Sequence, residues 1–147
     1  MKTLYNAVSS RLQNEADLKY IDFDLGQLDA LENDERPEVM FPCALIDIEY
    51  PLCEDETEKT QMVTARVNVR LGIEQQSPTD NLSTFARRNS GLAVFDVAED
   101  VYKALQGYSD ENFSSFSRKS VKPYRTFKGI KVIDITFETT FEDLSAE

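Results

Sequence analysis

Hydrophobic and polar residues alternate through residues 62–74, MVTARVNVRLGIE. One set comprises Val63, Ala65, Val67, Val69, Leu71 and Ile73, and the other comprises Met62, Thr64, Arg66, Asn68, Arg70 and Gly72. A period of two over this length predicts a long β-strand with one buried face. The opposite face carries two arginines, and what those arginines contact is the first functional question that the sequence raises.

The same alternation recurs in three shorter segments. These are residues 20–25, where apolar residues alternate with Asp22 and Asp24, residues 43–50 (CALIDIEY) and residues 130–141 (IKVIDITFETTF). Gly26 and Pro51 are typical of the ends of strands, so they are expected to close the first two. The 43–50 strand is predicted to pair antiparallel with the 62–74 strand.

Two segments have the spacing of amphipathic helices instead. Leu4, Val8 and Leu12 predict a short N-terminal helix. A second and longer helix is predicted from an apolar stripe formed by Leu82, Phe85, Ala86, Leu92, Phe95, Ala98, Val101, Tyr102 and Leu105. This helix is expected to begin with an N-terminal cap at Ser77 or Asp80 and with Pro78 in its first turn. Gly91 weakens it and predicts a kink or break, and Gly107 is expected to form its C-terminal cap.

The order of these elements predicts an α+β fold. We expect an antiparallel sheet of about four to five strands packed against a long helix and a short N-terminal helix. A chain of 147 residues is typical of a single domain, 1–147. Two acidic, aperiodic segments, about 27–42 and 52–61, are predicted to be extended loops, the first with a helical turn near Leu28 to Leu31.

Composition narrows the classes of function. A formal net charge of −11 argues against a protein that neutralises nucleic-acid phosphates or docks on an anionic membrane. The chain has no histidine, so the usual acid–base group at neutral pH and the commonest metal ligand are missing. It has no apolar run of the ~20 residues that span a bilayer, and its first residues lack the apolar core of a signal peptide. We therefore expect a protein made in the cytoplasm.

Acidic residues and cysteines are the remaining candidates for chemistry. Asp22 with Asp24, and Asp47 with Glu49, share one face of a predicted strand, but the apolar residues take the other face, which favours solvated carboxylates over a catalytic pair. The acidic run 54–58 lacks the ligand spacing of a calcium loop. Cys43 and Cys53 alone do not make a zinc site. We expect no catalytic residue, cofactor or metal.

A basic segment near the C-terminus has two interpretations. It interleaves cations with Tyr124 and Phe127, as single-stranded nucleic-acid binders do. In so acidic a chain, a contact to an acidic neighbour is favoured instead. The predicted subunit or partner interface therefore comprises Arg66, Arg70, Arg118, Lys119, Lys122, Arg125 and Lys128.

Four segments together resemble the tail-terminator or tail-completion proteins found in the neck of tailed bacteriophages. They are LYNAVSSRL near the start, the hairpin CALIDIEYP to MVTARVNVRLGIE, the helix LAVFDVAEDVYKALQG and the ending FKGIKVIDITFETTFED. The helix that closes in YKALQG, followed by a basic stretch and a terminal strand ending in acid, is the most specific part. The resemblance covers most of the chain and includes no catalytic signature.

The resemblance implies a non-enzymatic structural protein of the virion, located at the head–tail junction after synthesis in the host cytoplasm. Such proteins form rings, six-fold on the tail tube or twelve-fold on the portal side, and contact other neck, portal or tail proteins. DNA would pass through without specific binding, and no membrane is involved. The main alternative is a small cytoplasmic protein-binding adaptor unrelated to phage. A hydrolase that uses the strand carboxylates is a third and weaker option.

Overall fold

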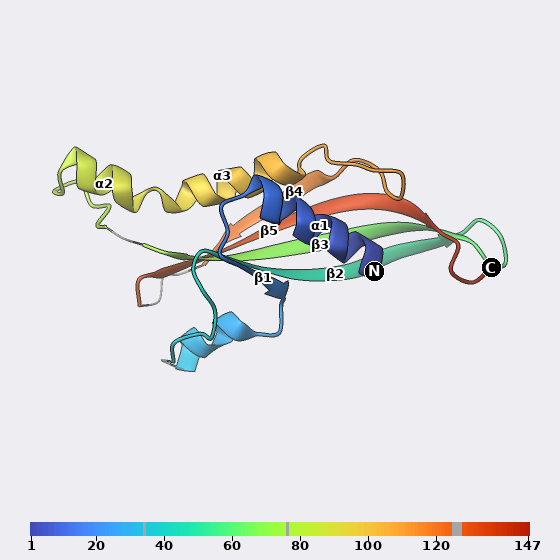
Figure 1. Ribbon diagram of the computed structural model, residues 1–147, viewed down its shortest axis with the longest axis horizontal. Helices are drawn as coiled ribbons and strands as arrows, with labels where there is room; N and C mark the ends of the chain where they lie inside the picture. Colours follow the sequence, from blue (N-terminus) through green and yellow to red (C-terminus); the bar gives the residue numbers. More distant parts are fainter. Residues whose placement is uncertain (34, 76, 125–127) are drawn as a thin grey trace.

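A mixed five-stranded sheet with strand order β1-β2-β3-β5-β4 forms the centre of the structure (Figure 1). The computed structural model describes residues 1–33, 35–75, 77–124 and 128–147. The strands are β1 (Tyr20–Phe23), β2 (Cys43–Asp55), β3 (Gln61–Glu74), β4 (Ser117–Pro123) and β5 (Ile130–Asp143). The helices are α1 (Lys2–Glu15), the 3-10 helix η1 (Gln27–Asn33), α2 (Phe85–Gly91) and α3 (Val94–Leu105). The predicted α+β class is confirmed.

The sheet is not purely antiparallel, and that part of the prediction was wrong. The pairs β2–β3, β3–β5 and β4–β5 are antiparallel, but β1 lies parallel to β2, with Tyr20 opposite Cys43 and Phe23 opposite Ile46. Parallel neighbours need a crossover connection of a dozen or more residues, whereas antiparallel ones can be joined by a tight turn. The long segment 24–42 between the two strands supplies that crossover.

The hairpin of β2 and β3 is longer than predicted. Pro51 does not end β2, which continues to Asp55. The pairing register with β3 shifts between Glu49 and Leu52, and Pro51 falls in that irregularity. A proline has no N–H for the ladder and is tolerated at such bulges. The predicted loop 52–61 therefore shrinks to the turn between Asp55 and Gln61.

The predicted long helix is two helices, α2 and α3, separated by Leu92 and Ala93. The break falls after Gly91, where a Cβ atom would lie 2.3 Å from the carbonyl oxygen of Ser77, so the backbone approach there requires glycine. The N-terminal cap of α2 is Thr84, whose side chain accepts a hydrogen bond from the Arg87 N–H, and neither Ser77 nor Asp80 caps it. Gly107, just beyond α3, has the positive φ of +75° expected there.

Helices α1 and α3 cover one face of the sheet, and the main core lies between these helices and the sheet (Figure 1). The predicted apolar face of β3 is buried in this core together with Leu4, Val8 and Leu12 of α1. From α3 the buried residues are Val94, Val101, Ala104 and Leu105. Arg11 joins the two helices by donating a hydrogen bond from Nε to the carbonyl oxygen of Ala104 at 2.9 Å.

The opposite face of the sheet is covered at one end only. Helix η1 buries Leu28 and Leu31 there, so the predicted helical turn is confirmed, and the extended loop predicted for 27–42 is partly a packed element. The cluster on this face also contains Phe41, Cys43, Leu45, Ile130 and Val132. The polar residues Arg66 and Arg70 of β3 lie on this same face of the sheet, and Arg70 lies beside the cluster, 3.7 Å from Asp29 of η1.

Candidate functional site

The two strand arginines lie in ion pairs within their own chain. In the register of β3 with β5, Arg66 lies opposite Glu138, Asn68 opposite Thr136 and Arg70 opposite Asp134. Directly opposed residues on one face of an antiparallel pair are close enough for their side chains to interact. Each of these three pairs is hydrogen-bonded, so the polar face of β3 forms a ladder of cross-strand contacts.

Arg66 is the exposed rung of this ladder. Its guanidinium donates to Glu49 of β2 at 2.8 Å and to Glu138 of β5 at 3.1 and 3.3 Å, so it bridges three strands. The hydrogen bonds to Glu49 and then to Glu138 raise the pKa of Arg66 above its ordinary value. Because the side chains of Arg66 and Glu49 are 42% and 60% exposed, solvent screens the contact and it contributes little to stability.

Arg70 is the sheltered rung. Its Nε and Nη2 donate to the two carboxylate oxygens of Asp134 at 2.8 and 3.0 Å, and the Tyr124 hydroxyl donates to the same carboxylate at 3.0 Å. Asp24 and Asp29 lie 4.0 and 3.7 Å from the guanidinium. The hydrogen bond to Asp134 raises the pKa of Arg70, so the side chain stays cationic. Such two-pronged, charge-assisted hydrogen bonds are among the strong ones in proteins.

The predicted interface role of Arg66 and Arg70 stays a prediction. In the structure, both side chains form ion pairs with carboxylates of their own chain. A guanidinium already held by carboxylates of its own chain has fewer N–H groups to offer a second subunit. The signal for this was present in the sequence, since Asp134, Thr136 and Glu138 alternate along the final strand as Arg66, Asn68 and Arg70 do along β3. The contact depends on the register of β3 with β5, which neither strand reveals by itself.

The basic residues near the C-terminus do not share one surface. Arg118 lies opposite Phe137 on the helix-covered face, with its guanidinium 3.9 Å from the ring centre of Tyr102. Lys122 lies opposite Asp134 on the polar face, 5.1 Å from the ring centre of Tyr124. Lys119 is exposed at the bulge between them, and Lys128 is exposed in the turn before β5. Arg125 and Phe127 lie outside the described residues.

The four candidate carboxylates each contact other groups of the chain. Asp22 accepts hydrogen bonds from the Tyr20 hydroxyl and the Phe23 N–H, and Asp47 accepts one from the Ile48 N–H. The other two carboxylates, Asp24 and Glu49, lie beside Arg70 and Arg66.

The two cysteines also lie apart. Cys43 is buried and Cys53 is exposed, ten positions further along β2. At about 3.3 Å per residue they are some 30 Å from each other, too far to share a metal ion or a disulfide. Burial raises the pKa of the Cys43 thiol to about 11. Across the described ranges, no group of three or more cysteine or acidic side chains is placed to hold a metal ion.

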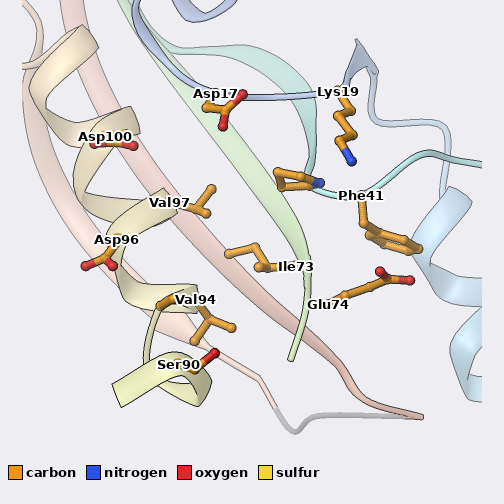
Figure 2. A pocket seen from close by; sticks show the side chains of 12 residues that line it. Asp17, Lys19, Phe41, Ile73, Glu74, Ser90, Val94, Asp96, Val97 and Asp100 are labelled. Carbon is orange, nitrogen blue, oxygen red and sulfur yellow. The ribbon is translucent and has the colours of Figure 1, made fainter. Parts of the chain in front are cut away.

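A cleft of about 430 Å³ lies between α3 and the end of β3 (Figure 2). Ile73, Val94 and Val97 point into it, and the carboxylates of Asp96 and Asp100 lie along its α3 side. The lining also includes Asp17, Lys19, Phe41 and Glu74. An apolar floor with an acidic rim suits a basic or apolar segment of a partner.

The largest departure from the sequence prediction is an exposed apolar surface on α2 and the start of α3. Leu82, Phe85, Leu92 and Phe95, which we call the apolar arm, are 90%, 76%, 41% and 53% exposed, although the sequence stripe placed them in the core. Helix α2 lies beyond the end of the sheet, and none of the strands in the described residues lies over it (Figure 1). Exposed apolar patches of this kind mark interaction surfaces.

The chain matches no protein-family model, and no curated protein sequence is significantly similar to it. Among the described residues, no helix combines the length and the apolar character needed to cross a bilayer.

Proposed function

We propose that this chain is a non-enzymatic structural protein of a tailed bacteriophage, which forms a ring at the head–tail junction as a tail terminator or tail-completion protein. The observation that carries the proposal is the order of the segments that resemble this family. They correspond to α1, to the hairpin of β2 and β3, to α3 with its YKALQG ending, and to β5. Together they include both helices of the main core and three of the strands.

The charge of the chain supports the same function. A ring assembled from subunits with a net charge of −11 repels DNA from its lumen, so that DNA slides through instead of binding. A ring of either six or twelve copies would have this property. The neighbours of such a ring are portal, neck or tail-tube proteins.

The proposal is tested in particles. A nonsense mutation in the gene should give DNA-filled heads and separate tails of irregular length, seen by electron microscopy, and wild-type protein supplied from a plasmid should restore joined particles. Density maps of wild-type particles should contain a ring of this fold at the neck. Normal infectious particles made without the protein would refute the proposal.

A second candidate, a small cytoplasmic protein-binding adaptor, is favoured by one observation. The apolar arm is a ready docking surface for any partner with an apolar pocket. The two candidates are separated by gene context and by composition of particles. An adaptor would be encoded away from portal, capsid and tail-tube genes, would be missing from purified particles, and would co-purify with a cellular protein.

A further inference from the structure

Two stretches of the sheet's edge have no neighbouring strand among the described residues. One is β4, the last strand on its side of the sheet. The other is the second part of β2, because β1 pairs only with residues 43–46 and leaves residues 47–55 with a strand on one side (Figure 1). A free edge presents main-chain N–H and C=O groups that can pair with a further strand. Each copy of the chain thus has a free edge on either side of its sheet.

On β2, the outward main-chain groups belong to Ile48 and Tyr50. The Ile46 carbonyl accepts a hydrogen bond from the Asp24 N–H on the side of β1, and every second residue of a strand faces the same side. The Ile48 N–H donates to the side chain of its neighbour Asp47 at 3.0 Å. This local contact satisfies an edge donor that has no strand beside it, and a bound strand can replace it.

On β4, the outward main-chain groups include those of Val121. The Tyr124 N–H donates to the Val132 carbonyl of β5, so Val121, three positions earlier, faces away from β5. The strand is exposed from Arg118 onward. The Arg118 N–H donates to the Gln106 side chain, so the free part of this edge begins after Arg118.

The two free edges carry opposite charge. Residues 47–55 of β2 include four acidic residues and no basic one, whereas β4 includes three basic residues and no acidic one. Like charges placed opposite one another destabilise a pair of strands, and opposite charges stabilise it. Two copies of the same edge therefore repel each other, and pairing of β4 with β2 is favoured.

The two faces of the sheet also match across such a joint. Lys122 of β4 and Glu49 of β2 both project from the polar face, as their cross-strand neighbours Asp134 and Arg66 show. The neighbouring residues Val121 and Tyr50 project from the helix-covered face, where Tyr50 packs against the main core. A continuous sheet would therefore bring opposite charges together on one face and apolar groups together on the other.

The directions of the strands set the geometry of the joint. Strand β3 is antiparallel to β2, β5 is antiparallel to β3, and β4 is antiparallel to β5. It follows that β4 runs antiparallel to β2. A second copy in the same orientation, beside the first, therefore presents its β2 antiparallel to the β4 of the first copy, which is the arrangement that a ring of identical subunits requires.

One register fits this joint, and it places Val121 opposite Tyr50. A shift by two residues toward β1 would bring Pro123 to Ile46, whose carbonyl is already bonded by β1. A shift by two residues in the other direction would place Val121 beyond the bulge of β2 that contains Pro51, where the ladder is interrupted. The pairing therefore has a single alignment that leaves β1 undisturbed.

In this register Pro123 lies opposite Ile48, beside a groove of about 560 Å³. The apolar lining of the groove includes Met1, Tyr5 and Phe23 as well as Ile48, and the two aromatic rings stack on each other with centres 4.2 Å apart. Pro123 is exposed and pairs with a core residue of β5, so it projects from the same helix-covered face as the groove. Its ring can enter the groove beside Ile48 without separating the stacked pair.

We infer that β4 of one copy binds the free edge of β2 in a second copy, so that the two sheets become continuous. Val121 and Tyr50 exchange two main-chain hydrogen bonds, and Lys122 pairs with Glu49 on the polar face. Each joint uses a different edge of each copy, so it is head-to-tail, and head-to-tail joints form a ring when their rotation closes. The inference names the subunit joint of the proposed function and rests on that function for closure of the ring.

Disulfide formation tests the register directly. In an antiparallel pair, opposed residues that do not exchange main-chain hydrogen bonds have Cα atoms roughly 4.5 Å apart, a distance that a disulfide can bridge. Protein carrying Glu49→Cys, Lys122→Cys and Cys53→Ser should therefore oxidise into a ladder of covalent oligomers on a non-reducing gel. The Cys53→Ser change removes the exposed native thiol, whereas Cys43 is buried.

Two matched pairs of cysteines are the controls, both in the Cys53→Ser protein. Asp47→Cys with Lys122→Cys is out of register by two residues, and Glu49→Cys with Arg87→Cys combines β2 with an exposed position on α2. Each control should give about tenfold less covalent oligomer, because its thiols are not held at bonding distance. Glu49→Cys protein mixed with Lys122→Cys protein should give a heterodimer and nothing larger.

Charge reversal tests the ion pair without added cysteines. Lys122→Glu should weaken self-association in sedimentation about tenfold, because it places acidic side chains on both edges of the joint. Adding Glu49→Lys to the same chain should restore association. Arg87→Glu changes the net charge equally, away from both edges, and should have little effect. Circular dichroism checks that each variant is folded.

Three results would overturn the inference. Equal oxidation of the in-register and control pairs would show random collision, and a doubly substituted protein that stops at dimers would show a two-fold contact. Wild-type protein that stays monomeric at about 1 mM, with no covalent ladder, would show that the charges and the bulge only guard the edges. A ring of this fold in particles would then use another contact, whereas a ladder together with normal particles lacking the protein would keep the joint and refute the proposed function.

Discussion

Replacing Arg70 by methionine should destabilise the protein through the carboxylate that it leaves behind. Asp134 is almost fully buried, and among the described residues Arg70 supplies two of the three side-chain hydrogen bonds that its carboxylate accepts. In Arg70→Met, the carboxylate of Asp134 keeps the Tyr124 hydroxyl from this set and loses the guanidinium that pairs with its charge. Methionine has about the length of the arginine stem, so packing against the sheet is largely preserved.

The size of the effect follows from burial. Breaking a fully buried ion pair costs about 3–5 kcal/mol, because one charge is left without compensation. The side chains of Arg70 and Asp134 are still 24% and 12% exposed, so solvent screening reduces this figure. We expect a loss of about 2–3 kcal/mol in the free energy of unfolding. For a chain of this size, that loss lowers the melting temperature by about 5–10 °C.

Urea unfolding followed by circular dichroism measures this loss. Arg66→Met is the matched control, since Arg66 lies on the same strand and face but pairs in the open, and its urea midpoint should stay close to that of wild type. Removing both charges in Arg70→Met with Asp134→Leu should recover most of the lost stability. If Arg70→Met and Arg66→Met unfold at the same urea concentration, the assignment of Arg70 as a structural anchor is wrong.

Three further predictions concern packing and thiol chemistry. Gly91→Ala should cost about 1–3 kcal/mol and speed amide exchange in α2, because the new methyl group would collide with the Ser77 carbonyl; unchanged exchange would contradict this. A thiol reagent should label Cys53 at once in folded protein and Cys43 only on unfolding. The pKa of the Cys43 thiol is about 11 in the folded protein and 9.0 in the unfolded chain, so between these pH values only the unfolded thiol ionises. The free energy of unfolding should therefore fall over this pH range, and it should fall less in Cys43→Ala.

The sequence predicted the elements with long, regular periods and failed where distant segments decide the outcome. The alternation of β3 and the spacing of Leu4, Val8 and Leu12 correspond to buried faces in the structure, because each pattern is long enough to define its own inner side. The four residues of β1 alternate equally well in a parallel or an antiparallel pair. No pattern within so short a strand indicates whether it pairs parallel or antiparallel to its neighbour.

The candidate site shows the same limit. The stripe from Leu82 to Leu105 predicts a helix with apolar residues, but it does not indicate which of them pack against the sheet. Phe85 lies beyond the end of the sheet and is exposed. The polar face of β3 was correctly placed opposite the core, whereas the partners of Arg66 and Arg70 depend on the register with β5. That register pairs residues far apart in the chain, such as Arg70 and Asp134, which are 64 positions apart.

The crossover between β1 and β2 has a consequence for the order of folding. It carries η1 onto the face of the sheet opposite α1, and both helices pack on elements that come later in the chain. The hydrogen bond from Arg11 to Ala104 spans 93 residues. Contacts between such distant positions form late, since a large loop must close first. During synthesis, the N-terminal segment therefore emerges from the ribosome first and completes its packing only after α3 has followed it.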